Sequence, residues 1–249
     1  SVEEMVSHLA RWKWRDGYGA PALVAGLTLA SWVQTLWRWR PLVCLTGESG
    51  SGKSTLFGYL AGLFGGLALL SCKPSEPGLR QAIGDRAPVV LIDEFENDAH
   101  RRKVLELLRT SGTGTKLLRG TPGAGHVEYG IQHICWVGAI EVGLDRQPDR
   151  NRYLSLELVA PHGPACNRLV NPTEAVLGEL GERLAAVAIW SVTRAREVAA
   201  ELRQVQLDGY DPRTIESLSV PASIYAVATG SVPAETLAYM AAQLEPSSG

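Results

Sequence analysis

The sequence predicts an α/β protein with a largely parallel sheet flanked by helices and followed by a C-terminal helical appendage. Between residues 41 and 160 of the 249-residue chain, short apolar runs alternate with leucines at helical spacing, the pattern of parallel strands joined by crossover helices. From residue 172 the chain is rich in Ala, Leu, Glu and Arg at helical spacing. We therefore divide it into an N-terminal helical segment (1–40), a core (41–171) and a C-terminal helical lid or appendage (172–249).

Composition and charge restrict the possible partners and compartment. The chain has 24 basic and 26 acidic residues, a net charge of -2, so no global positive field attracts nucleic acid and any such contact must be local. The four cysteines are scattered, form no CxxC pair and lack histidines at zinc-ligand spacing, which favours free thiols in a reducing compartment. The first residues lack the order of a signal peptide. We expect a cytoplasmic protein.

The first segment contains an apolar stretch at residues 21–37. It is about 17 residues long and includes Thr28, Ser31, Gln34 and Thr35, so it is short and polar for a bilayer span. We expect a buried helix that leads into the next strand, with no membrane contact.

Tryptophans alternate with basic residues in the same segment. Such interleaving can stack on single-stranded bases, and the region can also supply contacts to a nucleotide base. The favoured interpretation is that the rings pack the N-terminal helix onto the core or onto a neighbouring subunit. The five rings are Trp12, Trp14, Trp32, Trp37 and Trp39.

The core elements follow in order. An apolar strand at 41–46 precedes a glycine-rich loop and a helix from residue 53. A second strand at 67–71, a short helix through Leu79 and Ile83, and a strand at 87–94 that ends in two acids come next. A helix at 99–112 then ends at glycines.

The second half of the core begins with two strand arms at 116–132 around a Pro/Gly turn at 121–125, which predicts a hairpin. Buried strands at 133–142 and 150–161 complete the sheet. A long helix at 172–207 and two or three short helices, broken at Pro221 and Gly230, should follow.

The loop after the first strand carries the clearest motif. Gly47, Gly52, Lys53 and Ser54 satisfy G-x-x-x-x-G-K-S/T between a strand and a helix, the context in which this pattern binds phosphate. Backbone N–H groups and the helix N-terminus would hold phosphate oxygens, and Lys53 would reach the β- and γ-phosphates. We therefore predict binding of ATP, with the loop residues Gly47, Glu48, Ser49, Gly50, Ser51, Gly52, Lys53, Ser54 and Thr55.

Two acids follow the third strand, in "VVLIDEFEND". We expect Asp93 to hold Mg²⁺ together with the hydroxyl of Ser54, and Glu94 to orient or deprotonate a water molecule. A water-activating acid beside the metal acid favours hydrolysis over phosphoryl transfer to a small molecule.

These motifs resemble the ATPase of superfamily 3 helicases and of phage- and plasmid-type primase-helicases. The resemblance covers roughly residues 40–160 and depends on "GESGSGKST", "LIDEFEND", the hairpin "LLRGTPGAGHVEYG" and "DRNR". It implies a P-loop NTPase fold of the AAA+ kind and a ring, usually a hexamer, that draws single-stranded DNA through its pore.

The resemblance also suggests further site residues. The hairpin would be the pore element, with Lys116, Arg119 and His126 as contacts to the DNA backbone, although an ordinary surface hairpin would have the same sequence. Either Arg150 or Arg152 would complete the site of the neighbouring subunit, unless it pairs with a loop aspartate. In that family, one strand, called the sensor strand, ends in an amide or hydroxyl side chain that positions the attacking water. This chain has Ile140 and then Glu141 at the corresponding place, and Glu141 either takes that role or is a structural acid that pairs with an arginine.

The sequence thus predicts an ATP-hydrolysing, ring-forming motor on single-stranded or forked DNA, the helicase module of a mobile-element or phage replication protein. The alternative is an ATP-driven switch that remodels a protein partner without nucleic acid, which the near-neutral charge favours mildly. A small-molecule kinase is the third possibility, and Glu94 disfavours it.

Overall fold

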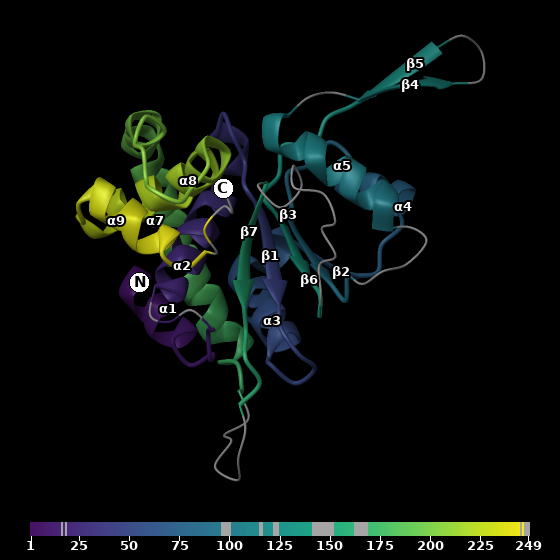
Figure 1. Ribbon diagram of the computed structural model, residues 1–249. Helices are drawn as coiled ribbons and strands as arrows, with labels where there is room; N and C mark the ends of the chain where they lie inside the picture. The colour runs from purple at the N-terminus through teal and green to yellow at the C-terminus, as the bar shows by residue number, and fades with distance from the viewer. Residues whose placement is uncertain are drawn as a thin grey trace.

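A central parallel sheet organises the protein (Figure 1). The computed structural model describes the chain except residues 16, 18, 96–100, 115–116, 122–124, 141–151, 162–168, 245 and 247–249, and except the side chains of residues 115–129. The sheet has five strands in the order β2-β3-β6-β1-β7, and each neighbouring pair is parallel. Its strands are β1 (Leu42–Thr46), β2 (Ala68–Cys72), β3 (Val89–Asp93), β6 (Cys135–Gly138) and β7 (Tyr153–Glu157).

Helices join and cover these strands. The predicted alternation of strand and helix is confirmed from β1 to β3, because α3 and α4 connect the strands in sequence. The helices are α1 (Val2–Leu9), α2 (Ala20–Trp32), α3 (Lys53–Phe64), α4 (Glu76–Ile83), α5 (Arg101–Thr113), α7 (Glu174–Leu202), α8 (Pro212–Thr229) and α9 (Pro233–Ala241), with 3-10 turns at Gln34–Leu36 and Gly65–Leu67.

Both faces of the sheet are buried, which explains why its strands are continuous apolar runs. In β1, Val43 and Leu45 point into one hydrophobic cluster, whereas Leu42 and Cys44 point into the other. The larger cluster joins the sheet to α1, α2, α3, α7, α8 and α9, and the smaller one joins it to α4 and α5. The protein is therefore an α/β structure with helical layers on both sides of the sheet (Figure 1).

Helix α2 confirms the buried helix expected near the N-terminus. Each of its residues from Ala20 to Ser31 is buried, since the helix lies between the sheet and the C-terminal helices. None of the described helices combines the length and the apolar character that a membrane span requires.

The tryptophans of the N-terminal segment serve mainly as packing residues. Trp12, Trp14 and Trp37 are buried in the larger cluster, and Trp32 packs against it. The indole of Trp14 donates to the carbonyl of Leu9, and that of Trp37 donates to Ala30. The favoured interpretation of this segment is confirmed for these four rings.

The C-terminal helices share the core of the sheet domain. Helix α7 crosses α3 so closely that a Cβ atom on Gly181 would lie 2.0 Å from the carbonyl oxygen of Leu63. Helix α8 approaches α2 equally closely, because a Cβ atom on Gly26 would lie 2.5 Å from the carbonyl oxygen of Pro221. The division into three parts stays a prediction, but residues from all three belong to one hydrophobic cluster.

The expected break at Pro221 is wrong. Helix α8 continues through Pro221 and ends at Gly230, which has a φ of +74° and was the other predicted break. An interior proline costs a helix about 3 kcal/mol. Here the buried contacts with α2 and α7 outweigh that cost, since tertiary packing supplies most of a helix's stability.

The predicted hairpin is confirmed in its backbone. Strands β4 (Leu117–Thr121) and β5 (Gly125–Tyr129) pair antiparallel, with Thr121 opposite Gly125 at the turn. Figure 1 shows the hairpin extending away from the sheet and its helices. It enters the fold at the amino end of β6, which is shorter than the strand predicted at 133–142.

Candidate functional site

The two sequence motifs meet at one edge of the sheet. All five strands run in the same direction, so the loop that follows β1 and the acids that follow β3 lie at the same carboxyl edge. Strand β6 lies between β1 and β3, and its last residue, Gly138, lines the same pocket as both motifs, followed by Ala139 and Ile140. In open parallel sheets this edge is where ligands bind.

The loop conformation depends on glycine at three positions. Gly47, Gly50 and Gly52 have φ angles of +144°, +82° and +93°, which side-chain-bearing residues rarely adopt. At Gly47 there is also no room for a side chain, since a Cβ atom would lie 2.2 Å from the carbonyl oxygen of Leu158. The motif glycines therefore let the chain turn sharply from β1 into α3.

Helix α3 begins at Lys53, directly after this turn. No side chain caps its N-terminus. The first N–H groups of an α-helix point out of its amino end, and together with the positive end of the helix dipole they favour an anion there. The Oγ of Ser51 is buried and has no hydrogen-bond partner among the described residues, which adds an unused polar group to the loop.

The Lys53 ammonium folds back across its own loop. Its Nζ donates to the carbonyl oxygen of Gly47 and, at 3.0 Å, to that of Glu48. These two hydrogen bonds join the side chain to the backbone of its own loop.

Asp93 and Glu94 form the acidic side. Asp93 is 8 % exposed, and one carboxylate oxygen accepts the N–H of Glu94 at 2.9 Å. Glu94 has a φ of +52°, a strained backbone for this residue type. Its carboxylate lies 3.4 Å from the Nζ of Lys73, which follows the neighbouring strand β2, and both side chains are more than half exposed.

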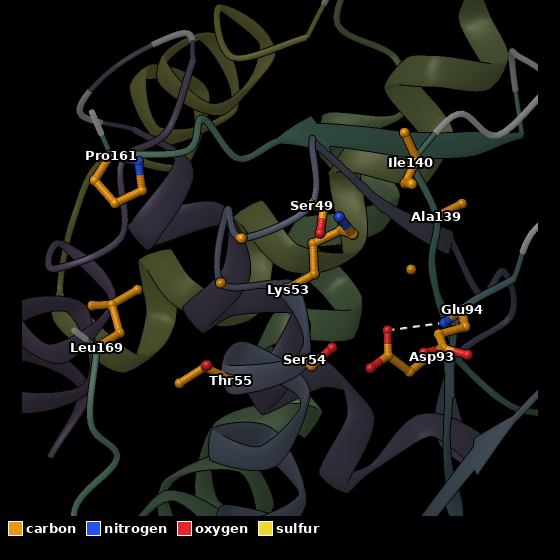
Figure 2. A pocket seen from close by; sticks show the side chains of 13 residues that line it. Ser49, Lys53, Ser54, Thr55, Asp93, Glu94, Ala139, Ile140, Pro161 and Leu169 are labelled. Atoms are coloured by element: carbon orange, nitrogen blue, oxygen red, sulfur yellow. Dashed lines mark hydrogen bonds between the residues drawn. The ribbon is translucent and has the colours of Figure 1, made fainter. Parts of the chain in front are cut away.

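A pocket of about 480 Å³ joins the loop to the acids (Figure 2). In the figure Lys53 and Ser54 lie between the acids on one side and Pro161 and Leu169 on the other. The volume falls within the range of roughly 300–1,000 Å³ that small-molecule sites occupy. The lining residues are Ser49, Gly50, Gly52, Lys53, Ser54, Thr55, Asp93, Glu94, Gly138, Ala139, Ile140, Pro161 and Leu169.

Two oxygen-bearing side chains of the pocket fit the ligands that Mg²⁺ takes. No group of three or more His, Cys, Asp or Glu side chains gathers at metal-binding distance in the described part of the chain. Ser54 and Asp93 both line the pocket, however, and Mg²⁺ is usually held by one or two protein oxygens together with water and substrate phosphates.

Of the other predicted site residues, the structure describes the whole of Arg152 alone, and it lies away from this pocket. Arg152 precedes β7, whose first residue pairs with Leu42 at the amino end of β1, so Arg152 lies at the opposite edge of the sheet. Its Nε is buried and has no hydrogen-bond partner among the described residues. Arg150, Glu141 and Lys116 lie outside the described residues, as do the side chains of Arg119 and His126.

Sequence reasoning missed several residues at the site. The indole of Trp12 donates to the carbonyl of Gly52 at 3.0 Å, and the amide of Asn171 donates to that of Thr55 at 2.8 Å. Leu169 and Pro161 line the pocket from far along the chain, where no motif marks them. Lys73 had a usable signal, since it directly follows a strand whose carboxyl end adjoins that of β3.

Comparison of the chain with models of known protein families and with curated proteins found no match. The functional argument therefore depends on the site itself.

Proposed function

We propose that this protein is an ATP-hydrolysing motor of the P-loop, AAA+-like kind that forms a ring and couples ATP hydrolysis to movement on DNA. One observation carries the ATPase part of the proposal. The glycine-rich loop between β1 and α3 faces Asp93 and Glu94 across a single pocket at the carboxyl edge of the parallel sheet.

The loop and α3 bind the phosphates in this proposal. The N–H groups of the first helical turn donate hydrogen bonds to phosphate oxygens. The Nζ of Lys53 gives up its hydrogen bonds to the carbonyls of Gly47 and Glu48 and donates to the β- and γ-phosphates instead. That exchange replaces neutral acceptors with charged ones, which form stronger hydrogen bonds. The fixed curvature of the loop means that little rearrangement accompanies binding.

Ser54 and Asp93 would hold Mg²⁺ against the phosphates, and the ion would neutralise charge on them as the terminal phosphate departs. Glu94 accepts a proton from the attacking water, for which it must release Lys73. Their pair is exposed, so it is worth about 0–1 kcal/mol and does not prevent this movement.

Arg152 acts on the neighbouring subunit. Strand β7 separates it from the pocket edge of its own chain by five residues, or about 16 Å, so it cannot reach its own nucleotide. An arginine in this position would stabilise charge on the γ-phosphate across a subunit boundary, as Arg150 would if it takes the role instead. A site divided in this way requires a neighbouring copy of the chain, and the resemblance to superfamily 3 helicases implies that the copies form a ring, usually of six subunits.

The DNA part of the proposal draws support from the hairpin β4–β5, which extends away from the body of the protein (Figure 1). A projecting hairpin of this kind can follow a strand through a ring, with Lys116, Arg119 and His126 as its predicted backbone contacts. The net charge of -2 favours the second candidate, an ATP-driven switch that remodels a protein partner.

ATP turnover with and without single-stranded DNA, across protein concentrations, tests the proposal. We expect turnover to rise with both concentration and DNA, and to be lost in Lys53→Ala, Glu94→Gln and Arg152→Ala. Arg102→Ala is the control for Arg152→Ala, because its side chain is exposed and pairs only with Glu106 on the same helix among the described contacts. Turnover that ignores DNA would instead support the protein-remodelling switch, and phosphoryl transfer to a metabolite would support a kinase.

A further inference from the structure

A second cleft, of about 380 Å³, lies outside the pocket of the phosphate loop. The segment between α2 and β1 forms one wall, and α7 and α8 form the others. Arg38, Arg196 and Arg203 line this cleft together with Trp37 and Trp39. Trp39 and Arg38 belong to the alternation of tryptophans and basic residues in the N-terminal segment, and packing of the core does not account for this pair.

The three guanidinium groups give the cleft a positive charge. No ion pair joins any of them to a carboxylate in the described part of the chain. Glu197 also lines the cleft, and its carboxylate accepts from Arg194 at 2.7 Å, so it pairs with an arginine outside the cleft. The planar guanidinium favours phosphate, which it can bind through two parallel hydrogen bonds.

Trp39 differs from the buried tryptophans because part of its ring is exposed. Its Nε1 donates to the Oγ of Ser217 on α8 at 3.0 Å, which holds the ring in place. A ring fixed beside unpaired arginines can stack on a nucleic acid base, and the arginines can bind the adjoining phosphates.

The cleft also lies at the end of the molecule from which the hairpin projects. Trp39 and Arg38 precede the amino end of β1, opposite the phosphate loop. A Cβ atom on Gly112, near the end of α5, would lie 3.6 Å from the Trp39 ring, and the hairpin begins at Leu117. A strand that contacts the hairpin would therefore pass close to the cleft.

We infer that this cleft binds single-stranded nucleic acid through its phosphates, with a base stacked on Trp39. The inference rests on the proposed function for the nature of the ligand, and it adds a binding site separate from both the hairpin and the nucleotide pocket. The charge of the whole chain does not attract a polyanion, so this local group of arginines supplies the attraction.

Fluorescence anisotropy of a labelled oligothymidine strand, titrated with the full chain without ATP, tests the inference. The double variant Arg196→Ala/Arg203→Ala is compared with Arg183→Ala/Arg102→Ala, which removes the same charge from exposed arginines outside the cleft. We expect the cleft variant to bind at least about tenfold more weakly than this control. The slope of log affinity against log salt should fall by about 1.4, since each phosphate contact on a single strand contributes about 0.7.

The variant Arg196→Lys/Arg203→Lys keeps the positive charge and is the control for loss of folding. Its slope of log affinity against log salt should return most of the way to the wild-type value. Equal affinity of the cleft variant and its control would overturn the inference. So would the absence of strand binding by the wild-type chain at low salt, or equal competition by polyglutamate, which would indicate an acidic protein partner. Competition by inorganic phosphate at the same concentration of phosphate groups would indicate a small ligand and would also overturn it.

The design separates the two proposals. The same titration with Lys53→Ala should give wild-type affinity, because the phosphate loop takes no part in strand binding at the cleft. Arginine-dependent binding by a chain that does not hydrolyse ATP would support the cleft and contradict the proposed function. DNA-stimulated ATP turnover, together with unchanged strand affinity in the cleft variant, would support the proposed function and contradict binding at the cleft.

Discussion

Alanine at Gly47 should destabilise the protein more than alanine at Gly50, although both residues belong to one loop. Both have a positive φ, so either substitution strains the backbone by about 1–3 kcal/mol. At Gly47 the new Cβ atom would also lie 2.2 Å from the carbonyl oxygen of Leu158, whereas at Gly50 no described atom lies within 4 Å. A backbone oxygen cannot rotate away, so overpacking adds about 1–3 kcal/mol at Gly47 alone.

Thermal unfolding followed by circular dichroism measures this difference. For a chain of this length, 1 kcal/mol shifts Tm by about 2–4 °C. Gly47→Ala should therefore melt about 2–12 °C below Gly50→Ala, in the absence of any ligand. If the two variants melt together, or if Gly50→Ala is the less stable, then the tight contact between the loop and the residue after β7 does not govern this site, and the reasoning from steric contact fails.

Three further perturbations have definite expected outcomes. Lys73→Ala should leave Tm nearly unchanged and raise steady-state ATP turnover by up to about fivefold, because an exposed pair restrains Glu94 by no more than about 1 kcal/mol; lower turnover would show that Lys73 assists catalysis. Gly181→Ala should cost about 1–3 kcal/mol in urea unfolding because it meets the backbone of α3, whereas Gly178→Ala on the same helix meets no described atom and should stabilise by about 0.5–1 kcal/mol; similar values would contradict the close crossing. Burial lowers the pKa of His133 to about 4 from its usual 6.5, so the folded state favours the neutral ring. The stability from this group is complete above pH 6.5 and falls by about 3 kcal/mol as the pH drops to 4, so His133→Gln should flatten the acid side of a pH series of urea titrations.

Local patterns predicted the elements that form the pocket between the glycine-rich loop and the two acids. The strands around Val43 and Val90 are continuous apolar runs because both faces of the sheet are covered, and that burial is visible in the sequence. The glycines of the loop and the two acids after β3 also follow from chemistry that acts over a few residues. Their meeting in one pocket followed from the parallel direction of the strands.

Long-range packing could not be predicted in the same way. Insertion of β6 between β1 and β3 depends on pairing between strands that are far apart in the sequence, such as Val43 with Trp136, and no local pattern encodes it. Proline disfavours a helix interior by its own chemistry, and the contacts of α8 with α2 and α7 outweigh that preference at Pro221. Lys73 and Leu169 reach the pocket for the same reason, since their roles depend on which strands and segments become neighbours.

The close crossing of α7 over α3 links the two proposed binding regions mechanically. Gly181, in the first half of α7, contacts α3, the helix that begins at the glycine-rich loop. Arg203 is the C-cap residue of α7 and lines the cleft that also contains Arg196. A straight helix over this interval spans about 33 Å. Because α7 is one continuous helix over this interval, a movement of α3 that shifted α7 at Gly181 would also shift the residues of α7 that line the cleft.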